Sequence, residues 1–169
     1  MDMSAKSAVS MDEYLRTSFE DLDREYVDGE IVERTLPTNL HSKAQFRLAA
    51  IFDALANTRP LYGRVELRSR VSATRVRIPD VSIYAYVEPT DPVPATPPFI
   101  AIEILSPDDK QRALIAKLQE YRNWGASHTW LVDPQNRKLQ IYENEALREV
   151  AAFDVPELDI HISAESIFR

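Results

Sequence analysis

The sequence contains no cysteine, which excludes a disulfide framework and any metal site built on thiolates. No apolar run approaches the ~20 residues that a helix needs to cross a bilayer. The opening segment, MDMSAKSAVS, lacks the apolar stretch of a signal peptide. The chain also has no glycine-rich phosphate loop, which disfavours a phosphotransfer enzyme of that kind. These absences predict a cytoplasmic protein that does not bind a membrane.

Positive charge is scarce as well. The 169 residues carry 27 acidic and 20 basic side chains, and the net charge of −7 by itself argues against a nucleic-acid partner. Residues 59–77 are the exception, because six arginines and one glutamate give this segment a net charge of +5. The remainder of the chain then carries a net charge of −12. Such a basic stripe can bind phosphates, although it can equally be the solvated face of a strand. The candidate nucleic-acid-binding residues are Arg64, Arg68, Arg70, Arg75 and Arg77.

The overall composition is that of a globular domain. Apolar residues make up 44% of the chain and charged residues 28%, which allows a substantial core. The length is that of one domain of ordinary size. We therefore expect a flexible or disordered N-terminus over residues 1–10 and a single domain over residues 11–169.

The first half of the chain predicts a helix-hairpin followed by a long helix and two strands. Ser10 and Glu13 have the spacing of a capping box at the start of a short helix. Asp28-Gly29 lies between two apolar pairs, which is typical of a two-residue hairpin turn. Helical spacing without proline or glycine predicts a helix over residues 41–59. Alternating patterns predict strands over residues 63–72 and 77–86.

The second half predicts a loop, a buried strand, a helix and a meander. Five prolines keep residues 87–98 out of a sheet interior. Residues 99–105 are apolar except at Glu103, as expected of a central strand buried on both faces. Ser106-Pro107 is a helix-start signal, and Gly125 ends that helix. Further strands are expected over residues 128–133, 138–143 and 147–153.

This order of elements predicts an α/β fold of the α+β type. Its centre is a mixed β-sheet flanked by helices, preceded by the N-terminal helix-hairpin and followed by a C-terminal antiparallel meander.

Two acids interrupt apolar strands. Asp80 follows a proline at the entrance of one strand, and Glu103 lies in the middle of another. Burying an unpaired carboxylate costs several kcal/mol. Two carboxylates on adjacent strands can instead hold a hard cation such as Mg²⁺, which neutralises phosphoryl charge and acidifies water. The alternatives are a turn acid at Asp80 and a structural ion pair between Glu103 and a nearby arginine.

The same two acids carry a family resemblance. Pro-Asp followed by an apolar strand with Glu about twenty residues later resembles the PD-(D/E)xK nuclease superfamily. The segments EYVDGEIVE, RIPDVSIY, FIAIEILSP, KLQEYRNWG and HTWLVDP occur in the order and spacing of the Uma2 family of endonucleases. This resemblance extends from about Met11 to the C-terminus.

The resemblance implies a restriction-endonuclease-like αβββαβ core. It also implies an endonuclease that hydrolyses phosphodiester bonds of nucleic acid, DNA rather than RNA, with Mg²⁺ or Mn²⁺. Asp80 and Glu103 would bind the ion together with the backbone carbonyl of Ile104. The superfamily's lysine position, two residues after the glutamate, is Leu105 here, and the matching basic residue of the Uma2 family is Lys117.

Helix geometry allows Lys117 this role. Leu114, Leu118 and Tyr121 share one stripe, and Lys117 lies about 60° from Leu114 on its flank. A lysine stem can lie along the sheet and bring its ammonium group toward the two carboxylates, reaching back to Asp80. The alternative is an ordinary surface lysine.

Three further residues are accessory candidates. Glu66 is either a third metal-site acid or the ion-pair partner of Arg68 or Arg64. His41 either leans over the site or is an exposed histidine. Tyr121 is read as a core residue rather than a base-stacking group.

The competing hypothesis is a catalytically degenerate module on the same fold that binds protein or nucleic acid. Apolar edge strands of the meander would make it a homodimer. The nuclease hypothesis requires the Asp80 and Glu103 carboxylates to lie on one face of the sheet, within about 5 Å of each other.

Overall fold

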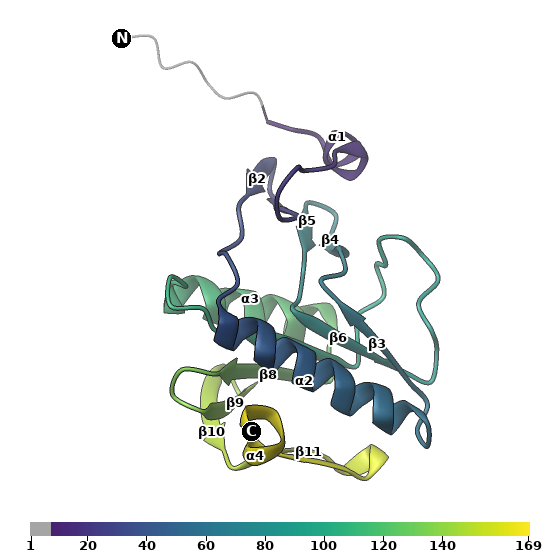
Figure 1. The fold of residues 1–169 in the computed structure, drawn as a ribbon. Coiled ribbons are helices and arrows are strands. Elements are labelled where there is room, and N and C mark those ends of the chain that lie inside the picture. Colours follow the sequence, from purple (N-terminus) through teal and green to yellow (C-terminus); the bar gives the residue numbers. More distant parts are fainter. Residues whose placement is uncertain (1–7) are drawn as a thin grey trace.

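A computed structural model describes residues 8–169 of the chain (Figure 1). The helices are α1 (Met11–Arg16), α2 (Asn39–Ala56), α3 (Gln111–Trp124) and α4 (Ala164–Phe168), with a 3₁₀ turn at Pro156–Leu158. The strands are β1 (Glu25–Val27), β2 (Glu30–Val32), β3 (Leu61–Val65), β4 (Ser69–Ser72), β5 (Arg75–Arg77), β6 (Val81–Ala85), β7 (Ile100–Ile104), β8 (His128–Asp133), β9 (Lys138–Glu143), β10 (Ala146–Val150), β11 (Ala152–Val155) and β12 (Ile160–Ser163). No helix in this range is long and apolar enough to span a bilayer.

A six-stranded mixed sheet forms the centre of the fold. Its strand order is β10-β9-β8-β7-β6-β3, with β7 and β8 parallel and the other neighbours antiparallel. The elements α2, β3, β6, β7, α3 and β8 follow the predicted αβββαβ order, because β4 and β5 leave this sheet and join another. The predicted fold class, a mixed sheet flanked by helices, is therefore confirmed.

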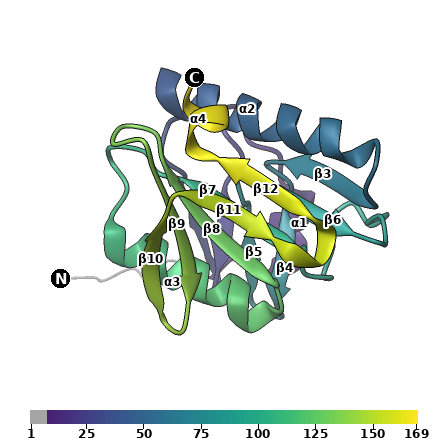
Figure 2. The same cartoon turned by 90° about the horizontal axis from the view of Figure 1, so that it is seen from below.

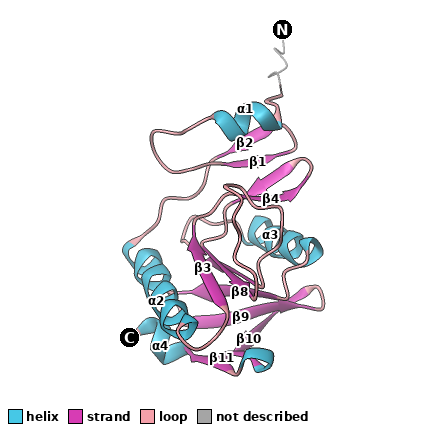
Figure 3. Cartoon of the chain, turned by 90° about the vertical axis from the view of Figure 1, so that its right-hand side faces the viewer, coloured by secondary structure: helices cyan, strands magenta, loops and turns pink. Residues whose placement is uncertain are grey.

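Each face of the sheet has its own core. Helix α2, helix α4 and the β11-β12 hairpin cover one face, and α3 covers the other (Figures 2 and 3). The first core contains a stacked pair, Trp130 of β8 and Phe153 of β11, whose ring centroids lie 4.1 Å apart. Because side chains alternate along a strand, Ile102 and Ile104 of β7 enter this core. Glu103 is directed to the other face, toward α3.

The N-terminal residues form a helix-hairpin, as predicted. Ser10 caps α1 in a capping box with Glu13. Asp28 and Gly29 turn β1 into β2 with positive φ angles of 51° and 94°, as a type I′ turn requires. Strands β1 and β2 join β5 and β4 in a second sheet, of order β2-β1-β5-β4. In Figure 1 this part of the chain lies above the edge of the central sheet.

Three predicted helix boundaries are wrong. The helix predicted over residues 41–59 is α2, which starts two residues earlier, after the cap Thr38, and ends three residues earlier. The helix predicted to start at Pro107, with Ser106 as its cap, starts at Gln111. The Asp109 carboxylate accepts the Ser106 N–H, and the Asp109 N–H donates to the Ser106 carbonyl, so a separate turn precedes α3. The predicted end of α3 before Gly125 is confirmed.

Three predicted strands are divided by the structure. The segment 63–72 breaks at Glu66, which has a φ of 50°, and its halves β3 and β4 belong to different sheets. The segment 77–86 is likewise shared between β5 and β6. The last part of the predicted meander splits into β10 and β11, although β8, β9 and β10 do form an antiparallel meander.

The predicted N-terminal tail, residues 1–10, lies largely outside the described residues. At its end, the Val9 N–H donates to the Gly29 carbonyl and the Val9 carbonyl accepts from the Tyr26 hydroxyl.

Candidate active site

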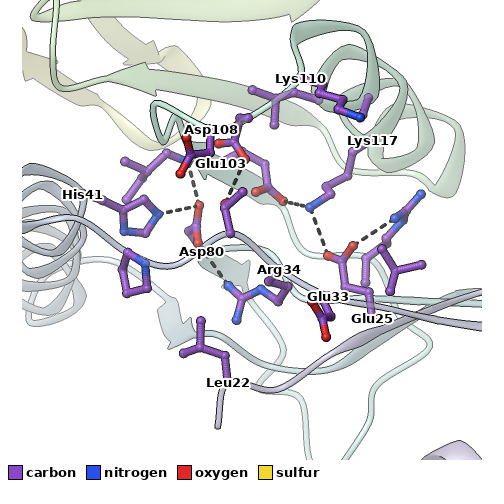
Figure 4. Close-up of a pocket in the computed structure, with 18 of the residues that line it drawn as sticks. Leu22, Glu25, Glu33, Arg34, His41, Asp80, Glu103, Asp108, Lys110 and Lys117 are labelled. Carbon is purple, nitrogen blue, oxygen red and sulfur yellow. Dashed lines mark hydrogen bonds and ion pairs between the residues drawn. The ribbon is translucent and has the colours of Figure 1, made fainter.

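Asp80 and Glu103 lie opposite each other on neighbouring strands. Val81 of β6 pairs with Ile102 of β7, and extending this antiparallel register by one residue places Asp80 across from Glu103. Residues opposite each other in such a pair share a face of the sheet. Both side chains line a pocket of about 560 Å³, and their residues are only 4% and 5% exposed (Figure 4). The structure thus brings the two predicted acids to one site.

The Asp80 carboxylate is bound from three elements. The Ile104 N–H donates to its Oδ2 at 2.7 Å, the Arg34 guanidinium donates to its Oδ1 at 3.3 Å, and His41 Nε2 lies 3.3 Å from Oδ2. Burial acts to raise the pKa of Asp80, but His41, the Ile104 N–H and Arg34 lower it below its ordinary value. Asp80 is therefore ionised, and its partners are not those of a local turn.

Glu103 has the opposite electrostatic character. Its Oε1 accepts a 2.6 Å hydrogen bond from the Tyr121 hydroxyl and lies 3.8 Å from Lys117 Nζ. Burial raises the pKa of Glu103 to about 8; Lys117 opposes this rise, and the charges of Asp80 and Glu25 add to it. Within residues 8–169 no arginine forms an ion pair with Glu103, and no hydrogen bond reaches its Oε2. One oxygen of a buried carboxyl is thus left for a ligand.

Lys117 lies between two buried acids rather than on the surface. Leu114, Leu118 and Tyr121 form the buried stripe of α3, as predicted, and the Lys117 side chain on its flank is only 18% exposed. Its Nζ lies 3.1 Å from Glu25 Oε1 and 3.8 Å from Glu103 Oε1. The predicted approach to the carboxylates is made to Glu103, whereas Arg34 and His41 bind Asp80 in place of Lys117. Burial lowers the pKa of Lys117, but Glu103 and Glu25 outweigh it and raise the pKa above its ordinary value.

Glu25 and Arg34 belong to the site, although the sequence did not predict a role for either residue. Glu25 opens β1, is 2% exposed, and lines the pocket. Arg34 lies in the connection between β2 and α2 and reaches Asp80 from there. The only local signal for Glu25 is an acid beside the apolar pair of a hairpin, and no local signal distinguishes Arg34 from other exposed arginines.

The accessory candidates have defined positions. His41 is buried, 5% exposed, and leans over Asp80 from the first turn of α2. Tyr121 is a core residue, and its hydroxyl contacts Glu103. Glu66 lines the pocket and lies 3.7 Å from Arg34 Nη1. The alternative pairing of Glu66 with Arg68 or Arg64 is not found, because Arg64 pairs with Glu88 and Arg68 with Asp23.

The five candidate phosphate-binding arginines do not form one stripe. They are distributed over β3, β4, β5 and the intervening loop, because the segment divides between two sheets. Only Arg77 lines the pocket, and Arg70 Nε is buried without a hydrogen-bond partner. The other four arginines form ion pairs: Arg64 with Glu88, Arg68 with Asp23, Arg75 with Asp28 and Glu120, and Arg77 with Glu25 and Glu120.

The residues at the site fit a small hard cation. Two facing carboxylates supply oxygen ligands, and Glu103 Oε2 is free to be one of them. The N–H and C=O of one strand residue point the same way, so the Ile104 carbonyl is directed toward Asp80, as its N–H is. Residues 8–169 contain no group of three or more His, Asp or Glu that could hold a metal. Carboxylate and carbonyl oxygens are the donors that hard divalent cations take.

Comparisons with known proteins identify the family and support the fold. Residues 11–165 match the model of the Uma2 family, described as "Putative restriction endonuclease". A solved structure of "a putative nuclease belonging to DUF820" from Anabaena variabilis ATCC 29413 superposes with a TM-score of 0.82. It is 23% identical in sequence, and the match covers 95% of this chain and 97% of that chain. Among curated proteins none matches. The family match over nearly the whole chain shows that this protein belongs to the Uma2 family.

Proposed function

We propose that this protein is a divalent-metal-dependent endonuclease that hydrolyses phosphodiester bonds of nucleic acid, with DNA preferred over RNA. The observation that carries the proposal is the pair Asp80 and Glu103, facing each other across β6 and β7 in one pocket with a half-buried lysine. The family supports a nuclease.

Asp80, Glu103 and the Ile104 carbonyl are the proposed ligands of Mg²⁺ or Mn²⁺. Such an ion would supply a Lewis acid that neutralises phosphoryl charge and lowers the pKa of water. Asp80 is already ionised, so it offers its charge without a proton transfer. Tyr121 orients Glu103 by holding its Oε1, which leaves Oε2 directed to the ligand.

Lys117 is the proposed substitute for the lysine that Leu105 displaces. Its raised pKa keeps the ammonium group charged at neutral pH. A fixed positive charge beside the carboxylates stabilises negative charge that develops on the phosphoryl oxygens. Because the side chain is held before substrate arrives, little reorganisation is needed during the reaction.

Phosphate contacts are also proposed for the arginines of residues 64–77 and for Lys110. Lys110 lines the pocket and forms no ion pair with any residue of the described chain. Arg70 likewise has no acid partner there. These two residues are the most available, because Arg64, Arg68, Arg75 and Arg77 each neutralise an acid. Contacts of this kind position the strand without reading its sequence.

The alternative is a degenerate nuclease fold that binds protein or nucleic acid as a homodimer. It is favoured by Leu105 at the usual lysine position and by the acid partners of the arginines. β10 is an edge strand of the central sheet and would be the pairing surface of the dimer.

Plasmid nicking in Mg²⁺ or Mn²⁺ separates the two proposals. Wild type should convert supercoiled plasmid to open circles, whereas Asp80→Ala and Glu103→Ala should lose at least ~100-fold in rate, as expected when electrostatic stabilisation is removed. Glu149→Gln is the matched control, because Glu149 is an exposed acid on β10, far along the chain from the site, and forms an ion pair with Lys138. If wild type cuts neither DNA nor RNA, or if the alanine variants cut as well as wild type, the nuclease proposal is rejected. The non-catalytic binding module then remains as the proposed function.

A further inference from the structure

We infer that Glu25 is a positioning residue for Lys117, so that the N-terminal helix-hairpin is part of the active site. The inference rests on the proposed function of Lys117. Glu25 is not among the residues that the sequence marks as catalytic, and it comes from β1, outside the αβββαβ core.

Lys117 is closer to Glu25 than to the acid of the proposed metal site. Its Nζ lies 3.1 Å from Glu25 Oε1 and 3.8 Å from Glu103 Oε1 (Figure 4). A lysine side chain has a flexible stem of four carbons, so its ammonium group would otherwise sample many positions. The Glu103 oxygen nearest to Lys117 is already bound by the Tyr121 hydroxyl. The contact that determines where the ammonium group stays is therefore the one with Glu25.

Glu25 is itself firmly held. Tyr26 of β1 pairs with Val76 of β5, and extending this register by one residue places Glu25 opposite Arg77. Arg77 Nη1 donates to Glu25 Oε2 at 2.9 Å, and the Ile78 N–H donates to Oε1 at 3.0 Å. Both oxygens are thus occupied by cations or N–H groups. These contacts fix the carboxylate against which the Lys117 ammonium group rests.

The pair of strands β1 and β5 contacts α3 at a second point, through β5. Arg77 also binds Glu120, which is one turn along α3 from Lys117. The contact between Arg77 and Glu120 docks the helix without involving the lysine. It therefore provides a control that separates helix docking from placement of the ammonium group.

A double-mutant cycle on cleavage tests the inference. Glu25→Gln should lower kcat about 100-fold, the cost of misplacing a catalytic group by about 1 Å. In a Lys117→Met background the same change should have less than about a twofold effect, because coupled residues are not additive. Glu120→Gln should keep most of the wild-type rate. Equal losses for Glu25→Gln in both backgrounds, or an equal loss in Glu120→Gln, would overturn the inference.

A second measurement does not depend on cleavage. NMR of uniformly ¹⁵N-labelled protein should show a slowly exchanging ammonium signal for Lys117, assigned by its loss in Lys117→Arg. The signal should vanish in Glu25→Gln and persist in Glu120→Gln. Glu25→Asp, which keeps the charge but shortens the side chain, tests the same point if Glu25→Gln does not fold, and should weaken the signal. An unchanged signal refutes the positioning role, whereas a protein that shows these changes yet cleaves nothing refutes the nuclease proposal alone.

Discussion

The protonation of Glu103 leads to a quantitative prediction for the free energy of unfolding. Its pKa is raised from the ordinary 4.5 to about 8 in the folded protein. Between these values the folded state holds a proton that the unfolded state has released. The stabilisation is fully present below pH 4.5 and is lost as the pH rises toward 8. In the absence of divalent ions, the wild type should therefore lose about 1.4 kcal/mol per pH unit in this range.

Glu103→Gln removes the titrating group and keeps the shape of the side chain. From pH 5.5 to 7.5 the free energy of unfolding of wild type should fall by roughly 3 kcal/mol relative to the variant. Asp80 and Glu25 do not interfere, because their pKa values are lowered and their contributions change only below this range.

Urea unfolding at pH 5.5, 6.5 and 7.5, with EDTA present, provides the assay. Tryptophan fluorescence reports the transition, since Trp130 lies in the core. Glu149→Gln, an exposed acid on β10, should follow the wild-type slope. Parallel pH dependences for wild type and Glu103→Gln would refute the reasoning, because Glu103 would then be ionised in the folded protein throughout.

Two further predictions concern the ion and the core. Binding of Mg²⁺ below pH 8 should release about one proton, from Glu103. The affinity for Mg²⁺ should therefore weaken about tenfold for each unit by which the pH falls below 8. Calorimetry in buffers of different ionisation enthalpy measures this release, and an affinity independent of pH would contradict the proposed ligand role of Glu103. Phe153→Ala should lower the free energy of unfolding by ~3–5 kcal/mol, because it removes the ring stacked on Trp130. Urea unfolding checks this, and a loss under about 1 kcal/mol would show that the hairpin carries little of the core.

Features that depend on neighbours in the sequence were predictable. Glu103 is conspicuous because an acid inside an apolar run is costly whatever the fold around it. The capping box at Ser10 and the turn at Asp28 involve residues at most three apart, and the structure has both. The flank position of Lys117 follows from helical spacing alone.

Features that depend on distant residues were not predictable in the same way. The sequence by itself determined which residues are chemically unusual and which segments are apolar enough to form the sheet. Only the tertiary structure decided that Lys117 meets Glu25 rather than Asp80, and that Arg34 and His41 bind Asp80. These pairs are separated by 39 to 92 residues along the chain. Their geometry arises from the packing of the hairpin, α2 and α3 against the sheet, and no local pattern encodes that packing.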